Sequence, residues 1–461
     1  MFYTEWGFKA NPFDTSPLSP NETGEALLVG RSRALKKLRS RILSGPKITS
    51  IEGMNGIGKT SVANVASYKI EQESLKGEIP GFFVPCRRVF QISPEKNPRD
   101  FRIEVLLDVV QTLIDRKSSI SPPPGRTRAP SEGPLNRWLN SVDNFSGQAG
   151  ILGCNIGISR ALTSSAGFDK SGFEKAALNW LQEIFPSHSD GGVICTIDNL
   201  ELLRTSQNAR NILEELRDPL FSIPGVRWVM CGALGIVHGI ASSPRLEGYL
   251  HAPIEIKDLP NIRAQDLFDA RVSAFKANDT ARLPISISDF RTLFYLYRGN
   301  IRSVLNALDE FCHYVADDEY DDLEDVSHLV FSDWLDEQGQ RAYSALAEEV
   351  EEKDLRTLAY ACVFQGVIRH SHYSHFGFDT PNDFAESVHV LEQLGVLRSV
   401  EDDSDAQREV IRVSPKGRLV DASRKLERFS ALVHLIQGGI HQDDGKWYDE
   451  SPNWSGETDV D

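Results

Sequence analysis

Residues 53–60 read Gly-Met-Asn-Gly-Ile-Gly-Lys-Thr, between a short β-prone segment and a segment without Gly or Pro that is typical of a helix. This spacing and context indicate a phosphate-binding loop whose glycines let backbone N–H groups point at phosphate oxygens. We expect Lys59 to be a solvated cation that reaches the β- and γ-phosphates, and the Thr60 hydroxyl to hold Mg²⁺. The predicted nucleotide-binding residues of this loop are Gly53, Asn55, Gly56, Ile57, Gly58, Lys59, Thr60 and Ser61. The motif predicts that the chain binds ATP.

Asp198 is the second candidate for the metal site. It ends the apolar segment 192–197, and a run that is apolar on both faces is typical of a central strand in a parallel sheet. An acid at the carboxyl end of such a strand lies where these sheets bind ligands. We therefore predict that Asp198 holds the water shell of Mg²⁺ opposite Thr60. The alternative is a surface aspartate that caps the next helix.

The elements that must position these residues alternate between strands and helices. The expected strands are 47–52, 81–92, 192–197, 226–231 and 251–257, and the expected helices are 32–43, 60–70, 101–116, 173–185 and 209–217. This alternation predicts an α/β fold with a doubly wound parallel sheet. Residues 117–170 interrupt it with a Ser/Pro/Arg/Gly-rich stretch and a candidate Gly-rich hairpin. This insert either contacts a partner or is an ordinary variable loop.

Composition narrows the class of protein. The chain has 461 residues, a hydrophobic content of 40% and a net charge of −16, and it contains no stretch of about 20 apolar residues that would span a membrane. Its start lacks the features of a signal peptide, and its six cysteines form no C-x-x-C motif. We expect a cytoplasmic, multi-domain protein with reduced thiols. The negative charge opposes general affinity for nucleic acid.

Several segments together resemble an AAA+ P-loop ATPase of the origin-recognition/initiator type, a group close to the signal-transducing STAND ATPases. The resemblance covers roughly residues 5–315. Its segments are Trp6-Gly7-Phe8-Lys9-Ala10-Asn11-Pro12-Phe13, Leu27-Leu28-Val29-Gly30-Arg31, Leu259-Pro260 with the helix 264–275 that contains Arg271, and Arg298-Gly299-Asn300-Ile301-Arg302. It implies a parallel-sheet ATPase domain followed by an α-helical lid.

The resemblance also implies roles for single residues. Val29, Gly30 and Arg31 match the box beside the adenine, and Arg302 matches the lid's sensor-2 arginine, although it could be a helix-surface residue. Arg245 lies where an arginine finger for a neighbouring subunit often lies.

Two departures from the family pattern concern catalysis. Asn199 occupies the position of the family's second acid, so Glu201 is the candidate base for hydrolysis. The strand 226–231 ends without an evident sensor-1 residue. We therefore expect an ATPase that binds ATP and hydrolyses it slowly.

The last third of the chain predicts a second kind of module. A helix pair followed by β-segments at 395–400 and 409–414 is typical of a winged helix, which serves in the family for DNA binding. The candidate recognition helix 381–394 contains acids but no Lys or Arg, and this favours protein docking over DNA. His370, His372 and His375 could suggest a metal, but a solvated polar loop is the favoured interpretation.

We predict the following organisation and function. The domains are an ATPase domain at 1–258 carrying the insert 117–170, a helical lid at 259–315, an acidic linker with a helix at 316–352, a winged helix at 353–430 and an acidic, disordered tail at 431–461. The protein is predicted to be a nucleotide-controlled switch that forms an ATP-dependent homo-oligomer and docks an effector protein, for example in bacterial phage defence. The alternative is a DNA-binding ATPase that regulates replication initiation, transposition or mobile-element maintenance.

Overall fold

The structure is a computed structural model of the chain. It describes residues 2–94, 96–120, 135, 170–203, 206–233, 243–246, 248–317, 323, 326, 328–364, 368–402 and 405–425. Most of the predicted insert 117–170 and all of the predicted tail 431–461 lie outside these residues. Within them, no helix has both the length and the apolar character needed to cross a membrane.

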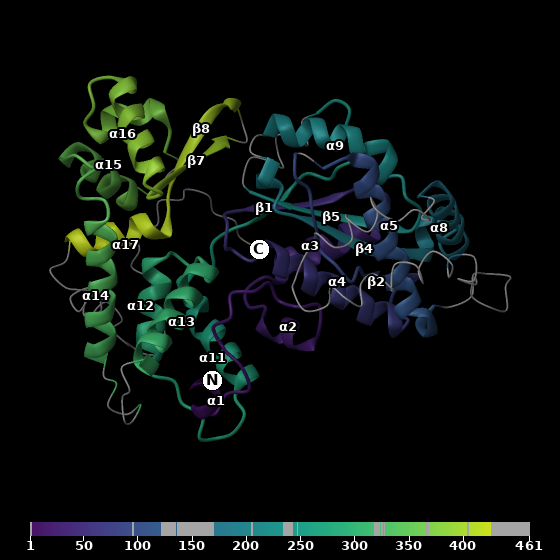
Figure 1. The fold of residues 1–461 in the computed structure, drawn as a ribbon, viewed down its shortest axis with the longest axis horizontal. Helices are drawn as coiled ribbons and strands as arrows, with labels where there is room; N and C mark the ends of the chain where they lie inside the picture. The colour runs from purple at the N-terminus through teal and green to yellow at the C-terminus, as the bar shows by residue number, and fades with distance from the viewer. Residues whose placement is uncertain are drawn as a thin grey trace, which may run out of the picture.

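A parallel sheet forms the centre of the N-terminal half (Figure 1). Its strands are β1 (Thr49–Gly53), β2 (Phe82–Pro85), β3 (Phe90–Gln91), β4 (Gly191–Asp198), β5 (Val226–Gly232) and β6 (Ile254–Ile256). The order is β2-β4-β5-β1-β6, and β3 pairs with the end of β4. β5 therefore lies between the strand that leads into the phosphate loop and the strand that ends in Asp198. The prediction of one strand at 81–92 is wrong, because the chain leaves the sheet between β2 and β3.

The two faces of the sheet are covered by different helices, as the doubly wound prediction requires. On β4, Val193, Cys195 and Ile197 pack into one core, and Ile194 between them packs into another. The helices on the first face are α5 (Pro98–Asp115), α8 (Lys170–Ile184) and α9 (Ser206–Leu220), and those on the second are α3 (Ser32–Leu43) and α4 (Lys59–Leu75). This burial of both faces explains why the strands are almost continuously apolar.

A helical lid follows the sheet and is built around a core of aromatic side chains that includes Phe290, Phe294 and Phe311. Its helices are α11 (Ala264–Phe275), α12 (Ile287–Leu296) and α13 (Ile301–Asp317). The N-terminal segment, with α1 (Phe2–Glu5) and α2 (Glu22–Leu27), also reaches the lid, since Phe8 and Phe13 are buried in the same core. Helix α14 (His328–Ser344) adds Phe331 and Trp334 to it.

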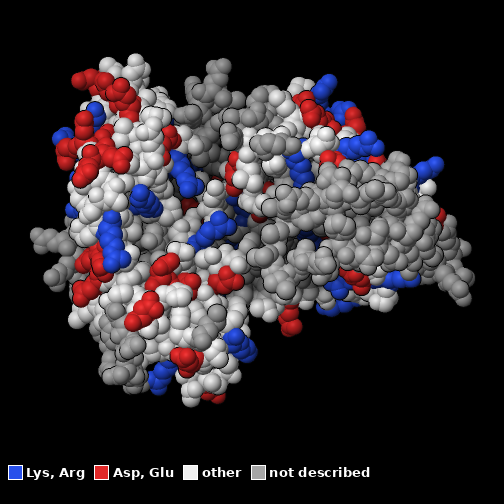
Figure 2. All heavy atoms as spheres, viewed as in Figure 1, with Lys and Arg blue, Asp and Glu red and all other residues white. Residues whose placement is uncertain are grey.

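The C-terminal module has a core of its own. It contains α15 (Glu352–Val363), α16 (Pro381–Gln393), the antiparallel strands β7 (Leu397–Asp402) and β8 (Asp405–Val413), and α17 (Pro415–Lys425). This is the element order expected for a winged helix, and a bridge from Ile368 to Ile411 adds a third β-segment. Figure 2 shows acidic side chains gathered over α15 and α16.

The three histidines before α16 lie in a short 3-10 helix, His370–Phe376, instead of the expected loop. Phe376 anchors it in the C-terminal core. Among the described residues, no group of three His, Cys, Asp or Glu side chains is placed to hold a metal ion.

Candidate nucleotide-binding site

A cavity of about 350 Å³ lies between the phosphate loop and the lid. This volume is at the lower end of the range for small-molecule sites, about 300–1,000 Å³. Its walls come from the N-terminal residues 15–18, the box residues 27–29 and Arg31, the loop residues 55–61, the end of β4 with the segment after it, and the lid. Five parts of the chain therefore meet at one site. Gly30 and Gly53 lie beside the cavity without lining it.

The glycines of the phosphate loop have two distinct reasons to be glycine. Gly56 and Gly58 have φ of +83° and +97°, in the left-handed region that other residues avoid. At Gly56 a Cβ atom would also lie 2.7 Å from Asn300 Oδ1 and 2.9 Å from Arg302 Cβ. The loop and the lid therefore pack against each other without room for a side chain.

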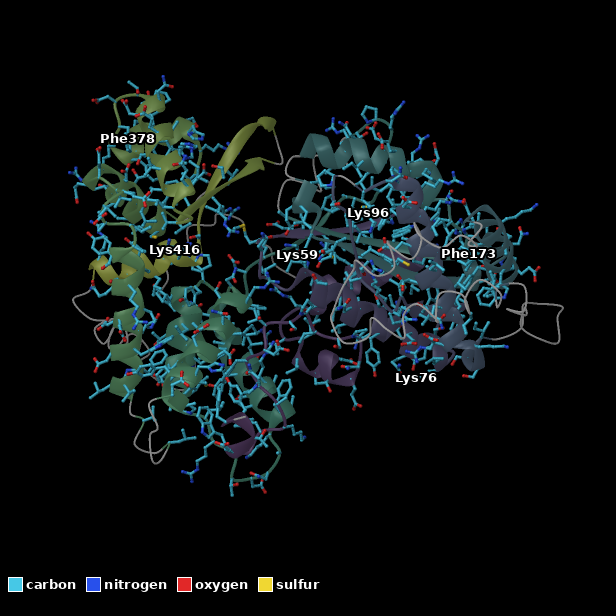
Figure 3. All side chains as sticks on the ribbon, in the orientation of Figure 1. Lys59, Lys76, Lys96, Phe173, Phe378 and Lys416 are labelled. Carbon is cyan, nitrogen blue, oxygen red and sulfur yellow. The ribbon has the colours of Figure 1, made fainter. Side chains whose placement is uncertain are left out.

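Lys59 is buried between the sheet and the lid, with 7% of its surface exposed (Figure 3). Its ammonium group donates to Gly53 O at 3.0 Å, Met54 O at 3.2 Å and Asn55 Oδ1 at 3.4 Å. Burial lowers the pKa of Lys59, and the nearby Glu201 carboxylate opposes this effect. The expectation of a solvated lysine is wrong, because the curled loop encloses the side chain and supplies its hydrogen-bond acceptors.

Thr60 and Asp198 meet at the carboxyl ends of the strands, as their positions in the sequence indicated. The Thr60 hydroxyl donates to Asp198 Oδ2 at 2.6 Å. Asp198 Oδ1 is buried and accepts no hydrogen bond within the described residues. These two hard oxygen donors, one with a free acceptor atom, fit the ligand preference of Mg²⁺.

The residues after Asp198 also face the cavity. Asn199, in the position of the family's second acid, has a left-handed φ of +57° and lines the cavity together with Glu201. Glu201 Oε2 is buried without a hydrogen-bond partner in the described part of the chain. A carboxylate with an unsatisfied oxygen is thus present at the cavity, two residues after Asn199.

Two of the three box residues, Val29 and Arg31, line the cavity. Arg31 is 7% exposed and donates to Lys257 O at 2.7 Å and to Ile57 O at 3.0 Å, so it ties the end of β6 to the phosphate loop. Burial lowers the pKa of Arg31 to about 10. Its hydrogen bonds indicate that Arg31 shapes the loop.

The lid's sensor-2 segment is hydrogen-bonded directly to the phosphate loop. Asn300 Nδ2 donates to Asn55 O at 2.8 Å, and the Arg302 backbone N–H donates to Gly56 O at 3.1 Å. The Arg302 side chain lines the cavity, and its guanidinium has no hydrogen bond or ion pair to any described residue. It is a free cation beside the position expected for the phosphates.

An N-terminal strap across the cavity, residues 11–18, is the part of the site that the sequence did not predict. Leu18 N donates to Ser61 Oγ at 3.1 Å, and the buried Arg271 donates to Pro12 O at 3.0 Å and Asp14 O at 2.9 Å. Ser61, predicted to bind nucleotide, thus accepts a hydrogen bond from the strap. The only sequence signal was the family likeness of the opening residues and of α11.

Arg245 lies apart from this cavity. Its side chain is 74% exposed, and its guanidinium is 3.5 Å from Glu214 Oε2. It does not line the cavity of its own chain. Any contact with a nucleotide would therefore have to be with one bound to another molecule.

Comparisons with known proteins add similarities in structure only. No family model matches the sequence, and no curated protein matches it. The ORC2 protein of Aeropyrum pernix, solved as ADPNP–ADP complexes, is 13% identical, with 94% of this chain and 99% of that chain covered and a TM-score of 0.46. The A. pernix ORC1 protein in complex with DNA is 12% identical, with 88% and 94% covered and a TM-score of 0.38. The Walker-type ATPase PABY2304 of Pyrococcus abyssi is 13% identical, with 89% and 99% covered and a TM-score of 0.43.

The fold can be stated from the chain's own geometry. A phosphate loop follows β1, the acid Asp198 ends a strand separated from β1 by β5, and a helical lid closes on the loop through Asn300 and Arg302. The chain therefore has a P-loop α/β fold with a parallel sheet and a helical lid, followed by a C-terminal module of helices and a β-hairpin.

Proposed function

We propose that this chain is an ATP-controlled switch that hydrolyses ATP slowly and docks an effector protein through its C-terminal module. The observation that carries the proposal is the pair of hydrogen bonds from Asn300 and Arg302 to the phosphate loop. A ligand that rearranges the loop carbonyls must also move or hold the lid.

The chemistry follows from the groups around the cavity. Lys59 and the backbone N–H groups of the loop neutralise the phosphates, and Thr60 and Asp198 hold Mg²⁺, which supplies further positive charge to the phosphate oxygens when bound. Glu201 accepts a proton from the attacking water. We expect slow turnover because Asn199 has replaced the acid closest to the metal.

The switch itself depends on Arg302. A guanidinium forms two parallel hydrogen bonds with phosphate oxygens, so it distinguishes ATP from ADP by the γ-phosphate. Because Arg302 is on the first turn of α13, this contact fixes the lid relative to the loop. Arg245, which is exposed and does not line the cavity of its own chain, completes the site of a neighbouring chain in an ATP-dependent homo-oligomer.

The effector surface lies on α15 and α16. A groove of about 620 Å³ there is lined by Glu349, Glu351 and Glu386, with Lys353 as the basic residue among its walls. Negative side chains repel DNA phosphates and attract a basic segment of a protein partner. Phage defence is one setting in which such an ATP-controlled effector would act.

Two substitutions at Asn300 test the switch. Asn300 Oδ1 accepts from Ser303 N at 3.2 Å and caps α13, while Nδ2 donates to the loop. Asn300→Asp keeps the cap and removes the donor, and Asn300→Ala removes both. Both variants should bind ATP. In the wild type, ATP should slow hydrogen exchange of α13 more than ADP does. In each variant, the two nucleotides should slow it to the same extent. An undiminished ATP–ADP difference in Asn300→Asp would overturn the proposal.

DNA binding is a second candidate because the hairpin carries a basic pair. Arg398 and Arg412 are direct cross-strand partners, and Arg412 Nε is buried without a partner among the described residues. Like charges directly opposite each other are destabilising, although Arg412 also lies near the Asp258 carboxylate, whose pKa it lowers against the effect of burial. Fluorescence anisotropy with a short DNA duplex at several salt concentrations would test this function. Salt-dependent binding that Arg398→Glu abolishes would favour DNA over the effector, and absence of binding would remove the DNA alternative.

A further inference from the structure

Two cysteines outside the nucleotide site lie side by side in the sheet. β2 pairs with β4 up to Pro85 and Ile194, and Cys86 N continues the ladder by donating to Ile194 O at 2.9 Å. The next residue on β4 is Cys195. Both cysteine side chains belong to the core on the α5 face of the sheet, so they point in the same direction.

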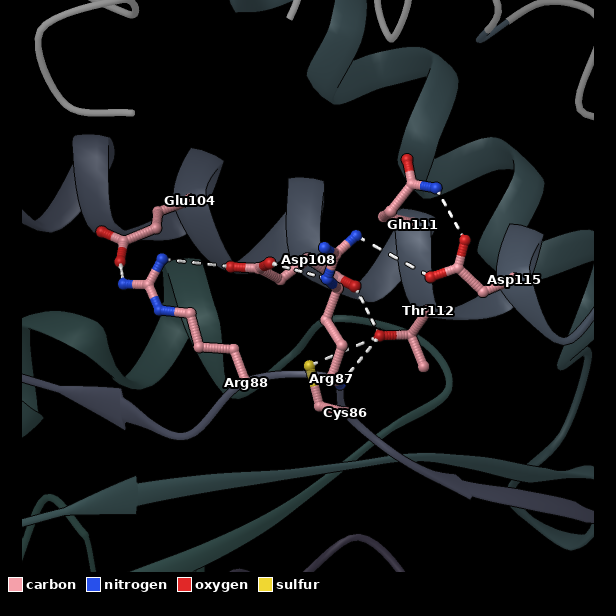
Figure 4. A network of polar contacts seen from close by, with 8 residues as sticks. All are labelled: Cys86, Arg87, Arg88, Glu104, Asp108, Gln111, Thr112 and Asp115. Carbon is pink, nitrogen blue, oxygen red and sulfur yellow. Dashed lines mark hydrogen bonds and ion pairs between the residues drawn. The ribbon is translucent and has the colours of Figure 1, made fainter. Parts of the chain in front are cut away.

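The segment that carries Cys86 is held on α5 by a polar network (Figure 4). Thr112 Oγ1 is 3.7 Å from Cys86 Sγ and accepts a hydrogen bond from Arg87 N at 3.1 Å. Arg88 is paired with both Glu104 and Asp108. These contacts draw Arg87 and Arg88 toward α5, just after Cys86 has made its hydrogen bond to β4 beside Cys195.

The two thiols differ in reactivity. Cys195 is fully buried, and burial raises its pKa. Cys86 is only half-buried, and a hydrogen bond from the Cys195 thiol lowers its pKa, although burial and Asp108 oppose this. Thiolate character and access to solvent are the properties that make a cysteine react with oxidants. Of the two thiols, Cys86 has the more exposed side chain and the lowered pKa, and Cys195 is adjacent to it.

The backbone spacing also suits a bond between the sulfurs. Neighbouring strands lie about 4.7–4.9 Å apart, which is within the Cα separation of about 4.4–6.8 Å found in disulfides. Cys86 is the first residue after β2, and its N–H bond to Ile194 O keeps it beside Cys195 at this strand spacing.

We propose that Cys86 and Cys195 are a peroxide-sensitive dithiol. The Cys86 thiolate attacks one oxygen of a hydroperoxide and breaks the O–O bond, which gives a sulfenic acid on Cys86 and releases water or an alcohol after protonation. The Cys195 sulfur then displaces the sulfenic oxygen, which leaves as water, and the disulfide forms. Two thiols are oxidised and one peroxide is reduced. A small-molecule or protein dithiol reverses the reaction.

The test uses the full chain with Cys154→Ser, because Cys154 lies outside the described residues. Reduced protein is treated with hydrogen peroxide, free thiols are blocked with a maleimide, and tryptic peptides are analysed by mass spectrometry without reduction. The expected result is a peptide joining Cys86 to Cys195, with two thiols lost per chain and recovered with dithiothreitol.

Two variants and a control make the result specific. Cys86→Ser should lose no thiols at the same peroxide dose, and Cys195→Ser should accumulate a Cys86 sulfenic acid that dimedone traps. Cys362→Ser is the matched control, since Cys362 is also half-buried, and it should behave as the parent chain does. Absence of the joined peptide, a disulfide from Cys86 to another cysteine, or equal thiol loss in Cys86→Ser would overturn the proposal. If Cys195→Ser does not fold, Cys86→Ser decides alone.

Discussion

Two buried aspartates, Asp198 in the ATPase domain and Asp354 in the C-terminal module, are used in opposite ways. Asp354 is 2% exposed, and both of its oxygens accept hydrogen bonds, Oδ1 from Ser387 Oγ at 2.6 Å and Oδ2 from Glu351 N at 2.9 Å. Asp198 is 7% exposed, and only Oδ2 has a partner among the described residues. The fold satisfies both oxygens of Asp354, whereas it leaves one oxygen of Asp198 for the Mg²⁺ that we propose this residue holds.

This difference separates structural polar groups from ligand-binding ones. A buried oxygen without a partner costs about 1–3 kcal/mol, so it persists where a ligand satisfies it. Asp198 and Glu201 meet this description in the ATPase domain. Around Ser387 in the C-terminal module, the hydroxyl contacts both Asp354 and Thr357 and holds α15 against α16.

The largest expected effect is on the rate of ATP hydrolysis, and it tests whether the unsatisfied carboxylate of Glu201 acts on the nucleotide. Glu201→Gln keeps the shape of the side chain but removes the base, so we expect the ATP turnover rate to fall by about 10²–10⁴-fold while ATP affinity stays the same. Steady-state phosphate release measures the rate. Glu215→Gln, on the exposed face of α9, is the matched control and should retain full turnover. Wild-type turnover in Glu201→Gln would assign the base to another group.

A somewhat smaller effect is expected on binding at Lys59. Charge-assisted hydrogen bonds contribute about 1.5–3 kcal/mol each, so Lys59→Ala should weaken ATP binding by about 100-fold. Isothermal titration measures the change. Lys76→Ala, at the other end of α4, is the control and should bind as the wild type does. An unchanged dissociation constant for ATP in Lys59→Ala would show that the nucleotide does not bind in this cavity.

Substitution of each of the two aspartates by asparagine tests the comparison through the free energy of unfolding. Asp354→Asn replaces an acceptor with an amide donor opposite the Ser387 hydroxyl or the Glu351 N–H, so we expect a loss of about 1–3 kcal/mol in the free energy of unfolding. Asp198→Asn should cost less than about 1 kcal/mol without nucleotide, yet abolish the dependence of ATP binding on Mg²⁺. Urea denaturation and titrations with and without Mg²⁺ measure the two effects. Equal destabilisation by both variants would contradict the distinction.

The smallest expected effect tests the contact between the phosphate loop and the lid at Gly56. Gly56→Ala imposes the left-handed penalty of about 1–2 kcal/mol and also a clash with Asn300 and Arg302, whereas Gly77→Ala, with φ of +72° and nothing within 4 Å, imposes the penalty alone. Gly56→Ala should therefore destabilise the chain more than Gly77→Ala and should increase hydrogen exchange in α13. Similar hydrogen exchange of α13 in the two variants would show that the contact at Gly56 does not couple the phosphate loop to the lid.

Local patterns predicted much of this molecule. The bounds of α3 and α11 match the expected helices at 32–43 and 264–275, and the order of strands and helices predicted the doubly wound sheet. Thr60 and Asp198 were paired because the phosphate loop follows one strand and Asp198 ends another, and parallel strands bring such ends together. Motifs that are encoded within a few residues, or by strand polarity, are therefore accessible from the sequence.

Contacts between distant segments were not accessible. The burial of Lys59, the role of Arg31 in bracing Ile57 and the strap held by Arg271 all depend on groups brought together by the tertiary fold. The break between β2 and β3 has the same origin, since Arg88 forms ion pairs with acids on α5 in place of a ladder position. No periodicity marks such interactions, because neither partner is near the other in sequence.

The strap also limits how far the lid can swing. It is fixed to the lid where Arg271 holds Asp14 O, and to helix α4 where Ser61 holds Leu18 N. The four peptide steps between these anchors span at most about 14 Å when fully extended. The strap thus limits the opening of the lid. A lid that opened farther to exchange nucleotide would first have to break the hydrogen bonds at one end of the strap. The rate of nucleotide exchange would then depend on the strength of the hydrogen bonds that Arg271 and Ser61 make to the strap.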